Sequence, residues 1–516
     1  MKLVKSLLLG SAAGLIAVGG AQAADLPVKA KAVEYVKICS LYGAGFYYIP
    51  GTDTCIKLSG YLRADVISGG AGDYGFNQSS ATVNGGSNNR LTNYFYTRAR
   101  MDFNVDTRTA TEYGVVRTYA DMIFSYDTNN VTGSSPSTLS TGNPSLGLYH
   151  AFIQFAGFTM GRTVSIFDAP WQSYPAGGPD SIPGGSNHVT GVNQFAYTAD
   201  FGQGITGSLA AEEDTTLTSG QSNLWNVTGF TASSAVSGAG AIVTTSAAAN
   251  AAAALIQGNY GVQAWGGTRS PDLVGAIRVD QAWGLAQVSV AAKDLHPAYY
   301  GTTEPTGHPS DKWGWAVQGA LSIKNIPTGA GDSINLQAVY TDGASKYNFQ
   351  TLFPQNFFMY SGTGVAGAYQ SIGFAGIADG VFGAGGSIET VKTWGFRGGY
   401  THNWNPYWVS AIYGGYAGLS YSSTAKTLIC TNFATIANPG ATCNPDFNFG
   451  VVGVNTVWTP VKNLAFTADL SWSRLDQKYS GTITAPAVST AAKPGAVYEL
   501  KDQNSLTLLL RAQRTF

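Results

Sequence analysis

Residues 503–516 read QNSLTLLLRAQRTF and alternate between two faces with a period of two, which is the pattern of a β-strand. One face carries Leu506, Leu508, Leu510, Ala512, Arg514 and Phe516, and the other carries Ser505, Thr507, Leu509, Arg511, Gln513 and Thr515. The mostly apolar face suits lipid and the largely polar face suits water, as in the closing strand of a membrane β-barrel. An amphipathic strand of a secreted β-sandwich would show the same pattern, so the rest of the chain has to separate the two.

The chain begins with a segment that is typical of an exported protein. Lys2 and Lys5 precede an apolar run over 7–18, and Ala21-Gln22-Ala23 follows. This order predicts a signal peptide over 1–23, with a run too short to span a membrane as a helix. Its removal leaves 27 basic and 30 acidic residues, a net charge of −3. Nothing in this balance indicates a nucleic-acid partner.

The composition favours the membrane barrel. Charged residues make up 11% of the chain, yet no second apolar run approaches the ~18 residues of a membrane helix. A β-barrel gives this combination because alternation spreads its apolar residues along each strand. The aromatic share of 12% supplies rings for the membrane interfaces, and the 65 glycines suit turns and bulges.

The four cysteines form two close pairs, Cys39 with Cys55 and Cys430 with Cys443. In an exported protein such pairs favour disulfides over metal sites, because neither has CxxC spacing and no histidine is near in sequence. Four reduced, partly buried thiols are the alternative. Residues 24–56 form an N-terminal segment, with a short hairpin expected to turn at Pro50-Gly51.

From residue 57 to residue 516 amphipathic runs alternate with connections, which are short and long in turn. We predict sixteen strands, at 57–67, 94–106, 112–124, 148–156, 158–164, 192–200, 204–213, 272–280, 284–293, 313–324, 332–341, 390–402, 407–420, 447–458, 463–474 and 503–516. Seven short turns and eight long loops are the layout of an up-and-down barrel whose ends face different compartments. The predicted fold class is therefore all-β, a 16-stranded antiparallel transmembrane barrel, too wide for side chains to fill.

Two of the long connections are unusual. Residues 214–271 contain an Ala-rich run at 247–254 that favours a helix, and residues 341–389 are rich in glycine. Neither resembles a domain of its own, and either is a candidate for partial disorder.

The sequence shows no convincing enzyme motif. The histidines, His150, His188, His296, His308 and His402, are scattered without HExxH, and GxSxG is absent. GxGxxG occurs at 70–75, 202–207 and 362–367, but never between a buried strand and a helix as nucleotide binding requires. We therefore expect no enzymatic activity, no cofactor and no metal site.

Charged side chains gather on the parity that faces the lumen. The arginines are Arg63, Arg98, Arg100, Arg117, Arg162, Arg278, Arg397 and Arg511, and the carboxylates are Asp102, Asp121, Asp280 and Asp469. Fixed guanidinium groups that face carboxylates would set a field across a narrow pore and bias ion passage. Alternatively, each arginine pairs with a neighbouring carboxylate and stiffens the wall.

The third long loop, 163–192, is stiffened by Pro170, Pro175, Pro179 and Pro183. Such a loop can fold back into the pore and narrow it, with Asp168 and Asp180 opposite the wall arginines. An ordinary external loop is the alternative.

Short blocks along the whole chain resemble the alphaproteobacterial general porins. They are ADLP at 24–27, the block from Cys39 to Arg63, GFTMGR at 157–162, DQAWG at 280–284, HNWNPYW at 402–408, VWTPVK at 457–462 and QRTF at 513–516. The resemblance implies a homotrimer of sixteen-stranded barrels in the bacterial outer membrane, in contact with its lipids and lipopolysaccharide. It also implies passive diffusion of ions and small hydrophilic solutes, a third loop folded inward, and matching positions for Arg162 and Asp168.

Two other functions stay open at this point. One is a substrate-selective uptake pore, which saturating flux would reveal, and the other is an adhesive or structural surface barrel, which would conduct poorly. The sign of ion selectivity is open as well, since wall arginines favour anions and the net charge of −3 favours cations. Whether the Asp- and Asn-rich loops hold calcium is also undecided.

Overall fold

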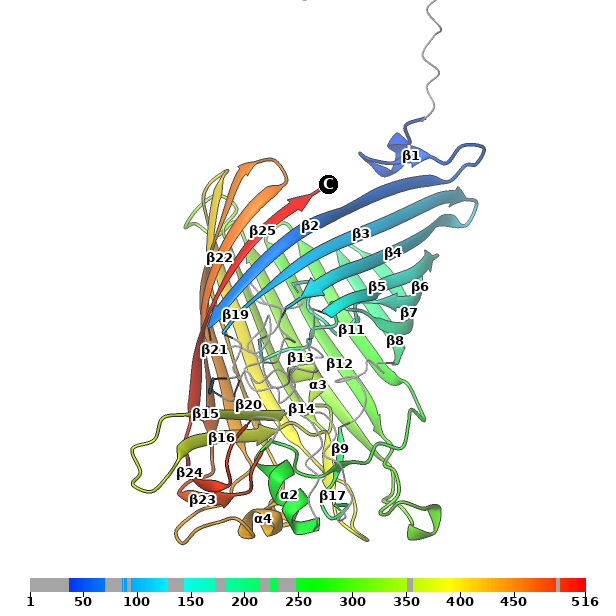
Figure 1. Cartoon of the computed structure of the whole chain (residues 1–516). Coiled ribbons are helices and arrows are strands. Elements are labelled where there is room, and N and C mark those ends of the chain that lie inside the picture. The colour runs from blue at the N-terminus through cyan, green and yellow to red at the C-terminus, as the bar shows by residue number, and fades with distance from the viewer. Residues whose placement is uncertain are drawn as a thin grey trace, which may run out of the picture.

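Sixteen antiparallel strands close into a barrel in the computed structural model of the chain (Figure 1). The structure describes residues 37–69, 86, 88–90, 94–128, 143–171, 182–213, 223–230, 247–349, 356–488 and 492–516, so the predicted signal peptide lies outside it. The first eight barrel strands are β2 (Cys55–Gly69), β3 (Phe95–Thr111), β4 (Gly114–Asp127), β5 (Asn143–Phe155), β6 (Phe158–Thr163), β7 (Val192–Gly202), β8 (Ile205–Glu213) and β11 (Asp272–Gln281). The other eight are β12 (Gly284–Leu295), β13 (Lys312–Lys324), β14 (Ser333–Asp342), β19 (Lys392–Asn405), β20 (Trp408–Ser420), β21 (Phe447–Val461), β22 (Leu464–Gln477) and β25 (Gln503–Thr515).

The C-terminal strand closes the barrel, as its alternation predicts. β25 pairs with β22 on one side and with β2 on the other, where Ala512 faces Ala64. Leu506 is 56% exposed, whereas Leu509 is 3% exposed against Ile67 of β2. Large apolar side chains also point outward on the other barrel strands, where they are exposed. The outer surface is therefore suited to the hydrocarbon of a bilayer.

All sixteen predicted strands are present, and three hairpins turn later than predicted. β19 continues to Asn405 and β21 to Val461, each three residues beyond its predicted end, and the third hairpin is that of β3 and β4. We expected a turn at 107–111, but the pairing of β3 with β4 continues to Thr111 opposite Gly114. Threonine is β-branched and pairs well across strands, and Thr107 and Thr118 hydrogen-bond to each other through their hydroxyl groups. The turn therefore falls on Glu112 and Tyr113.

The N-terminal segment forms a small hairpin at the end of the barrel that carries the short turns. β1 (Tyr47–Tyr48) pairs with the start of β2, and the amide of Thr52 donates to the carbonyl of Ile49 across Pro50-Gly51. A disulfide joins Cys39 to Cys55, with their Cα atoms 6.0 Å apart. A short 3-10 helix, η1 (Ser40–Tyr42), lies within this segment.

The opposite end of the barrel carries a folded layer, which we call the cap. It is built from four loops: L4 (214–271), L6 (343–391), L7 (421–446) and L8 (478–502). One four-stranded sheet holds β9 (Leu224–Asn226), β10 (Val262–Gln263), β17 (Gly380–Phe382) and β18 (Glu389–Thr390), and a second holds β15 (Asn356–Ser361), β16 (Gln370–Gly376), β23 (Thr482–Ala485) and β24 (Ala496–Leu500). The helices are α2 (Ala247–Leu255), which confirms the helix expected at 247–254, α3 (Lys346–Phe349) and α4 (Ser423–Ala434), while η3 (Glu304–Thr306) belongs to the loop between β12 and β13.

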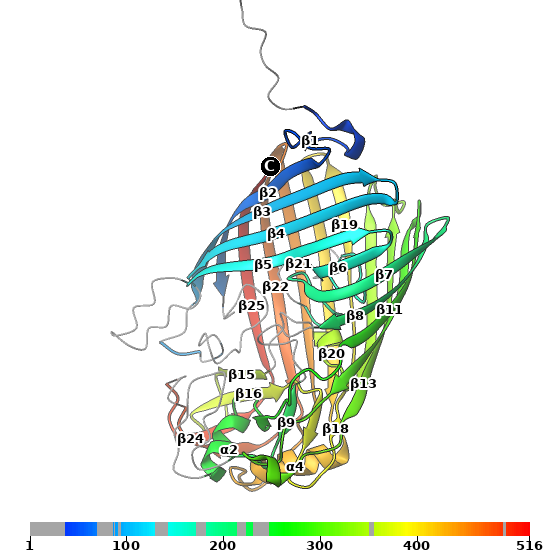
Figure 2. The same ribbon diagram turned by 90° about the vertical axis from the view of Figure 1, so that its right-hand side faces the viewer.

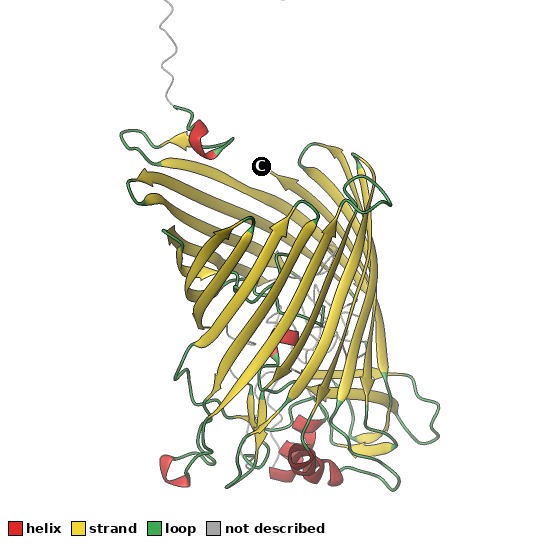
Figure 3. Ribbon diagram, turned by 180° about the vertical axis from the view of Figure 1, so that it is seen from behind, coloured by secondary structure: helices red, strands yellow, loops and turns green. Residues whose placement is uncertain are grey.

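The cap has a hydrophobic core of its own, which the sequence analysis did not foresee. Phe357, Phe358 and Phe374 from L6 are fully buried against Phe447 and Phe449 from the inner face of β21. Most of the helical residues gather at this end of the molecule (Figures 2 and 3). A second disulfide, Cys430 to Cys443, ties α4 to the segment before β21. None of the helices in the described ranges is long and apolar enough to cross a membrane.

Candidate functional site

The third loop, L3 (164–191), folds into the barrel and packs on the inner wall. Its first leg lies over β8, β12 and β13. The Ile166 amide donates to Glu212 on β8 (3.1 Å), while Gln287 on β12 donates to the carbonyl of Asp168 (3.0 Å). Gln318 on β13 donates to the carbonyl of Phe167 (2.8 Å). The inward amide side chains thus satisfy loop carbonyls that would otherwise be buried without partners.

The inward course of L3 is fixed in part by an aromatic anchor. Phe167 is fully buried, and its ring lies 4.4 Å from the ring of Tyr347 on α3. Small residues on the inner wall make room for it, namely Ala196, Ala210, Val274, Ala291, Ala316 and Val339. Packing of this kind stabilises an inward-folded loop, because the buried apolar area is removed from water.

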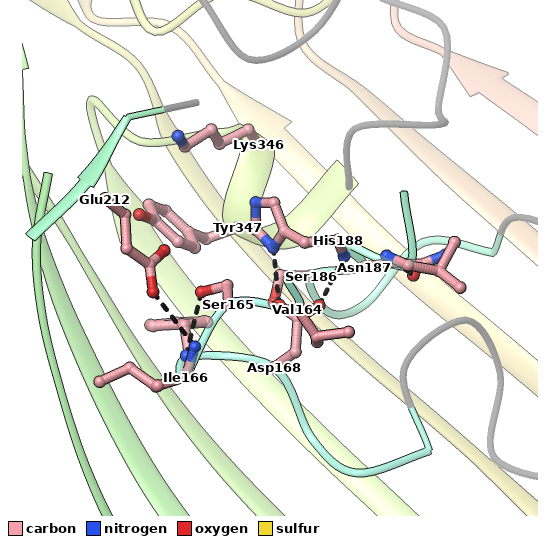
Figure 4. Close-up of polar contacts among 12 residues, drawn as sticks. Val164, Ser165, Ile166, Asp168, Ser186, Asn187, His188, Glu212, Lys346 and Tyr347 are labelled. Atoms are coloured by element: carbon pink, nitrogen blue, oxygen red, sulfur yellow. Dashed lines mark hydrogen bonds and ion pairs between the residues drawn. The ribbon is translucent and has the colours of Figure 1, made fainter. Parts of the chain in front are cut away.

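Asp168 organises the centre of L3 (Figure 4). Its carboxylate lies 2.8 Å from Nδ1 of His188 and accepts hydrogen bonds from the Ser186 hydroxyl and the His188 amide. Burial by itself raises the pKa of this carboxyl, but His188 and these hydrogen bonds outweigh it, so the pKa of Asp168 is lowered from 3.8. Because both side chains are buried, the pair is closed to water. It joins the first leg of the loop to the returning leg.

The returning leg of L3 lies over β14 and β19, which adjoin β13 on the same side of the barrel. Arg397 on β19 donates to the carbonyl of Ser186 (2.7 Å) and to Gln337 on β14 (2.7 Å). Gly184 has φ of +98°, and a Cβ there would collide with the Phe396 carbonyl, so only glycine fits. The loop then reaches β5, where Nε2 of His150 lies 3.0 Å from the carbonyl of Val189.

The arginines on β2 to β6 face the other part of the lumen. Arg63 donates to Gln513 (2.9 Å), Arg100 to Ser125 (2.8 Å) and Arg162 to the carbonyl of Leu148 (3.1 Å). These partners are uncharged, and they hold the guanidinium groups on the wall.

Other wall arginines form ion pairs, as the alternative interpretation predicted. Arg98 lies 2.8 Å from Asp127, Arg117 lies 3.0 Å from Asp106, and Arg278 lies 2.5 Å from Asp280. Arg511 pairs with Asp65 at 2.7 Å. Arg278 and Asp280 lie on the same strand, whereas the other three pairs join neighbouring strands, stiffen the wall and satisfy charges that are partly buried.

Three of the predicted lumen carboxylates, Asp102, Asp121 and Asp469, lie outside the arginine ion pairs described above. Asp102 and Asp121 lie on β3 and β4, close to Arg100. Asp121 is 3.8 Å from His150, and Asp469 accepts from the hydroxyl of Tyr413 (2.7 Å).

Two predicted lining residues have a different environment from the one expected. Asp168 is 5% exposed and Arg397 is 1% exposed, because L3 covers both of them. A loop carboxylate looks like a pore-facing charge in the sequence, and its partners Ser186 and His188 are too distant in sequence to signal burial. Asp180, the other acidic candidate of the third loop, lies outside the described residues.

The residues that hold L3 were missed by the sequence analysis. Gln287, Gln318 and Gln337 occupy the inward parity of β12, β13 and β14, and all three are buried beneath the loop. Uncharged amides at one level on three successive strands are the signal that would have identified the wall on which L3 rests.

Comparisons with known proteins decide the family of this barrel. A family model described as a porin subfamily matches residues 25–509. The chain belongs to this porin family. Porin Omp2b of Brucella suis biovar 1 and Porin Omp2b of Brucella abortus are each 31% identical to it, over 66% of this chain and 85% of theirs. The outer membrane channel DcaP of Acinetobacter baumannii is 16% identical with a TM-score of 0.53, and the match covers 91% of this chain and 99% of that one.

The porin is therefore an outer-membrane channel for small solutes, as the sequence predicted. Its family is one of channels rather than enzymes. The similarity to an alphaproteobacterial relative also confirms the resemblance that the short blocks of sequence indicated.

Proposed function

We propose that solutes pass through this porin by passive diffusion between L3 and the wall of β2 to β4, and that this gap is its narrowest part. One observation carries the proposal. The described residues of L3 pack on β7, β8, β12 to β14 and β19 and end against His150 of β5, while Arg63, Arg100 and Arg117 lie on β2, β3 and β4. A loop that fills one side of a wide barrel leaves the other side for water.

The charged wall then acts directly on permeant ions. We assign this role to Arg63, Arg100, Arg117, Arg162 and Arg278, whose guanidinium groups stay charged at any physiological pH. Arg98, which was also predicted to line the pore, is buried against Asp127, and we assign it to stiffening of the wall. Asp180 is a candidate for the opposing negative charge. Asp168 and Arg397 serve a different purpose, because they are buried and hold the loop in place. Arginines at the narrowest part favour anions there.

The assembly and surroundings complete the proposal. The resemblance to general porins supports a homotrimer in contact with outer-membrane lipids and lipopolysaccharide, with ions and small hydrophilic molecules as its solutes. We further propose export through residues 1–23, cleaved after Ala23, an N-terminal segment over 24–56 and the barrel over 57–516.

Liposome swelling tests the passive mechanism. Purified porin in liposomes should admit neutral sugars at rates that fall steadily with molecular size and rise linearly with concentration. Flux that saturates for one sugar would instead indicate a substrate-selective pore.

The position of the path is tested by charge removal. Arg100→Gln should shift the reversal potential in a salt gradient toward cation preference, because one fixed positive charge leaves the narrow region. Arg474→Gln is the matched control, since Arg474 lies on the outward parity of β22 and pairs with Asp502 (2.7 Å). Equal reversal potentials for wild type and Arg100→Gln would contradict the proposed path.

A further inference from the structure

The helix α3 of L6 lies inside the barrel, against the constriction loop (Figure 1). It follows directly after β14, where residues 344–349 are all buried. A loop segment that leaves a strand at the barrel rim would normally turn outward into water. This one turns inward and meets L3.

The contact between α3 and L3 involves both legs of the loop. The ring of Tyr347 packs on Phe167 of the first leg, with ring centroids 4.4 Å apart. The carbonyl of Asn348 accepts hydrogen bonds from the amides of Gly184 and Gly185 on the returning leg, both at 3.1 Å. The two legs are thus held from one side by a single turn of helix.

The helix is fastened to the barrel wall by a buried charge pair. Nζ of Lys346 lies 2.8 Å from the carboxylate of Asp272 at the start of β11, and the hydroxyl of Tyr347 donates to the same carboxylate (2.8 Å). Lys293 on β12 lies 3.9 Å from that carboxylate. Buried charges of this kind hold position strictly, because separation would leave each one unpaired in a dry site.

The helix is also fastened to the cap. The amide and the hydroxyl of Ser345 both donate to Oδ1 of Asp379, at 2.7 and 2.8 Å, while the other carboxylate oxygen accepts from the amide of Asn223 in L4 (2.9 Å). Asp379 is itself buried. Wall, cap and constriction loop therefore meet at one short segment.

We propose that α3 is a latch that positions L3, with Tyr347 as the positioning residue that sets the width of the channel. The latch acts through the loop and contacts no permeant solute. It rests on the proposed function of L3 as the narrow part of the pore. The segment 344–349 of L6 therefore sets the channel width and is anchored to the cap as well.

Single-channel recording of the native, full-length porin tests the latch. Tyr347→Ala should raise the conductance and the noise of the open channel, because Phe167 loses its cover and L3 gains freedom. Tyr347→Phe loses the hydrogen bond to Asp272 but keeps the ring on Phe167 and the Lys346–Asp272 ion pair, so its conductance should be close to that of the wild type. Tyr299→Ala, which truncates an exposed tyrosine of the loop between β12 and β13, is the control for loss of an aromatic ring and should leave conductance unchanged. Wild-type conductance in folded Tyr347→Ala would overturn the proposal.

Hydrogen exchange gives a second test that needs no variant. The amides of Gly184 and Gly185 should exchange slowly in wild-type porin, since they donate to Asn348 within the packed latch. Exchange as fast as that of open loops would overturn the latch even if the channel conducts. A wild-type protein without conductance but with slow exchange at these two amides would contradict the proposed function and leave the latch standing.

Discussion

The carboxylate of Asp168 lies 2.8 Å from Nδ1 of His188, twenty residues further along the same loop, and both side chains are buried. This contact closes L3 on itself inside the barrel. The loop that narrows the lumen is therefore a preformed unit, and the width of the channel depends on the stability of that loop.

Removal of Asp168 should loosen the constriction. In Asp168→Ala the imidazole of His188 and the hydroxyl of Ser186 lose their acceptor, and breaking a buried pair costs about 3–5 kcal/mol. We expect much faster exchange of the Gly191 amide, which donates to the His188 carbonyl (2.8 Å). Asp311→Ala is the matched control, because Asp311 forms a similar pair with His296 (2.7 Å) at a partly exposed site. Equal exchange at Gly191 in both variants would refute a structural role for the buried pair.

Acid should release the loop only at low pH. The pKa of Asp168 is lowered from 3.8, so its carboxylate stabilises the folded loop above that pH, and the contribution is lost as pH falls through the lower, folded-state value. The charged or titratable neighbours of Asp168 are His188, Glu212 on β8 and Arg397 on β19. We predict that exchange at Gly191 reports a constant loop stability from pH 7 down to about 4 and a decline below it. A midpoint near pH 6 would assign the anchoring to another group.

A methyl group at Gly184 should displace the returning leg of L3. Gly184→Ala places a Cβ against the Phe396 carbonyl at φ of +98°, a conformation that costs an L-residue roughly 1–2 kcal/mol even without the collision. Conductance should change and become noisier. Gly362→Ala is the control, since a Cβ there has open space around it. Identical recordings from the two variants would show that L3 does not need this close approach.

The stability of the cap should depend on the Cys430–Cys443 disulfide. The bridge closes a loop with a sequence separation of 13 residues, for which chain entropy gives about 3 kcal/mol. In the double variant Cys430→Ser, Cys443→Ser, amide exchange in α4 should accelerate. Replacing Cys39 and Cys55 by serine should leave α4 as it is, since that bridge lies at the other end of the barrel. Unchanged exchange in α4 after loss of its own bridge would contradict this prediction.

The barrel was predictable from the sequence because each strand carries its own signal. Leu506, Leu508 and Leu510 alternate with Thr507, Leu509 and Arg511, and this local pattern needs no information from elsewhere. The number of strands and the alternation of short and long connections follow when the same pattern is sought along the whole chain.

The cap was not predictable in this way, because its core joins apolar residues from four separate loops. Phe374 of L6 meets Tyr479 of L8, and Tyr260 of L4 meets Tyr421 of L7, although each loop alone is too short to bury its own apolar surface. One signal was available, since Phe447 and Phe449 occupy the inward parity of β21, where a watery lumen would favour polar residues. Large rings on that parity indicate that something covers them.

The same distinction applies to the lumen. The parity of Arg63, Arg98, Arg100 and Arg117 was readable along each strand. The burial of Asp168 and Arg397 was not, because it depends on where L3 lies after the barrel has closed.

Planar-bilayer conductance of the purified native protein tests the central claim most directly. A trimer of open barrels, each narrowed by L3 against the arginine wall, predicts stable current steps that arrive in threes and increase linearly with voltage at low potentials. A folded, heat-modifiable protein that inserts into the bilayer and carries no current would contradict the account.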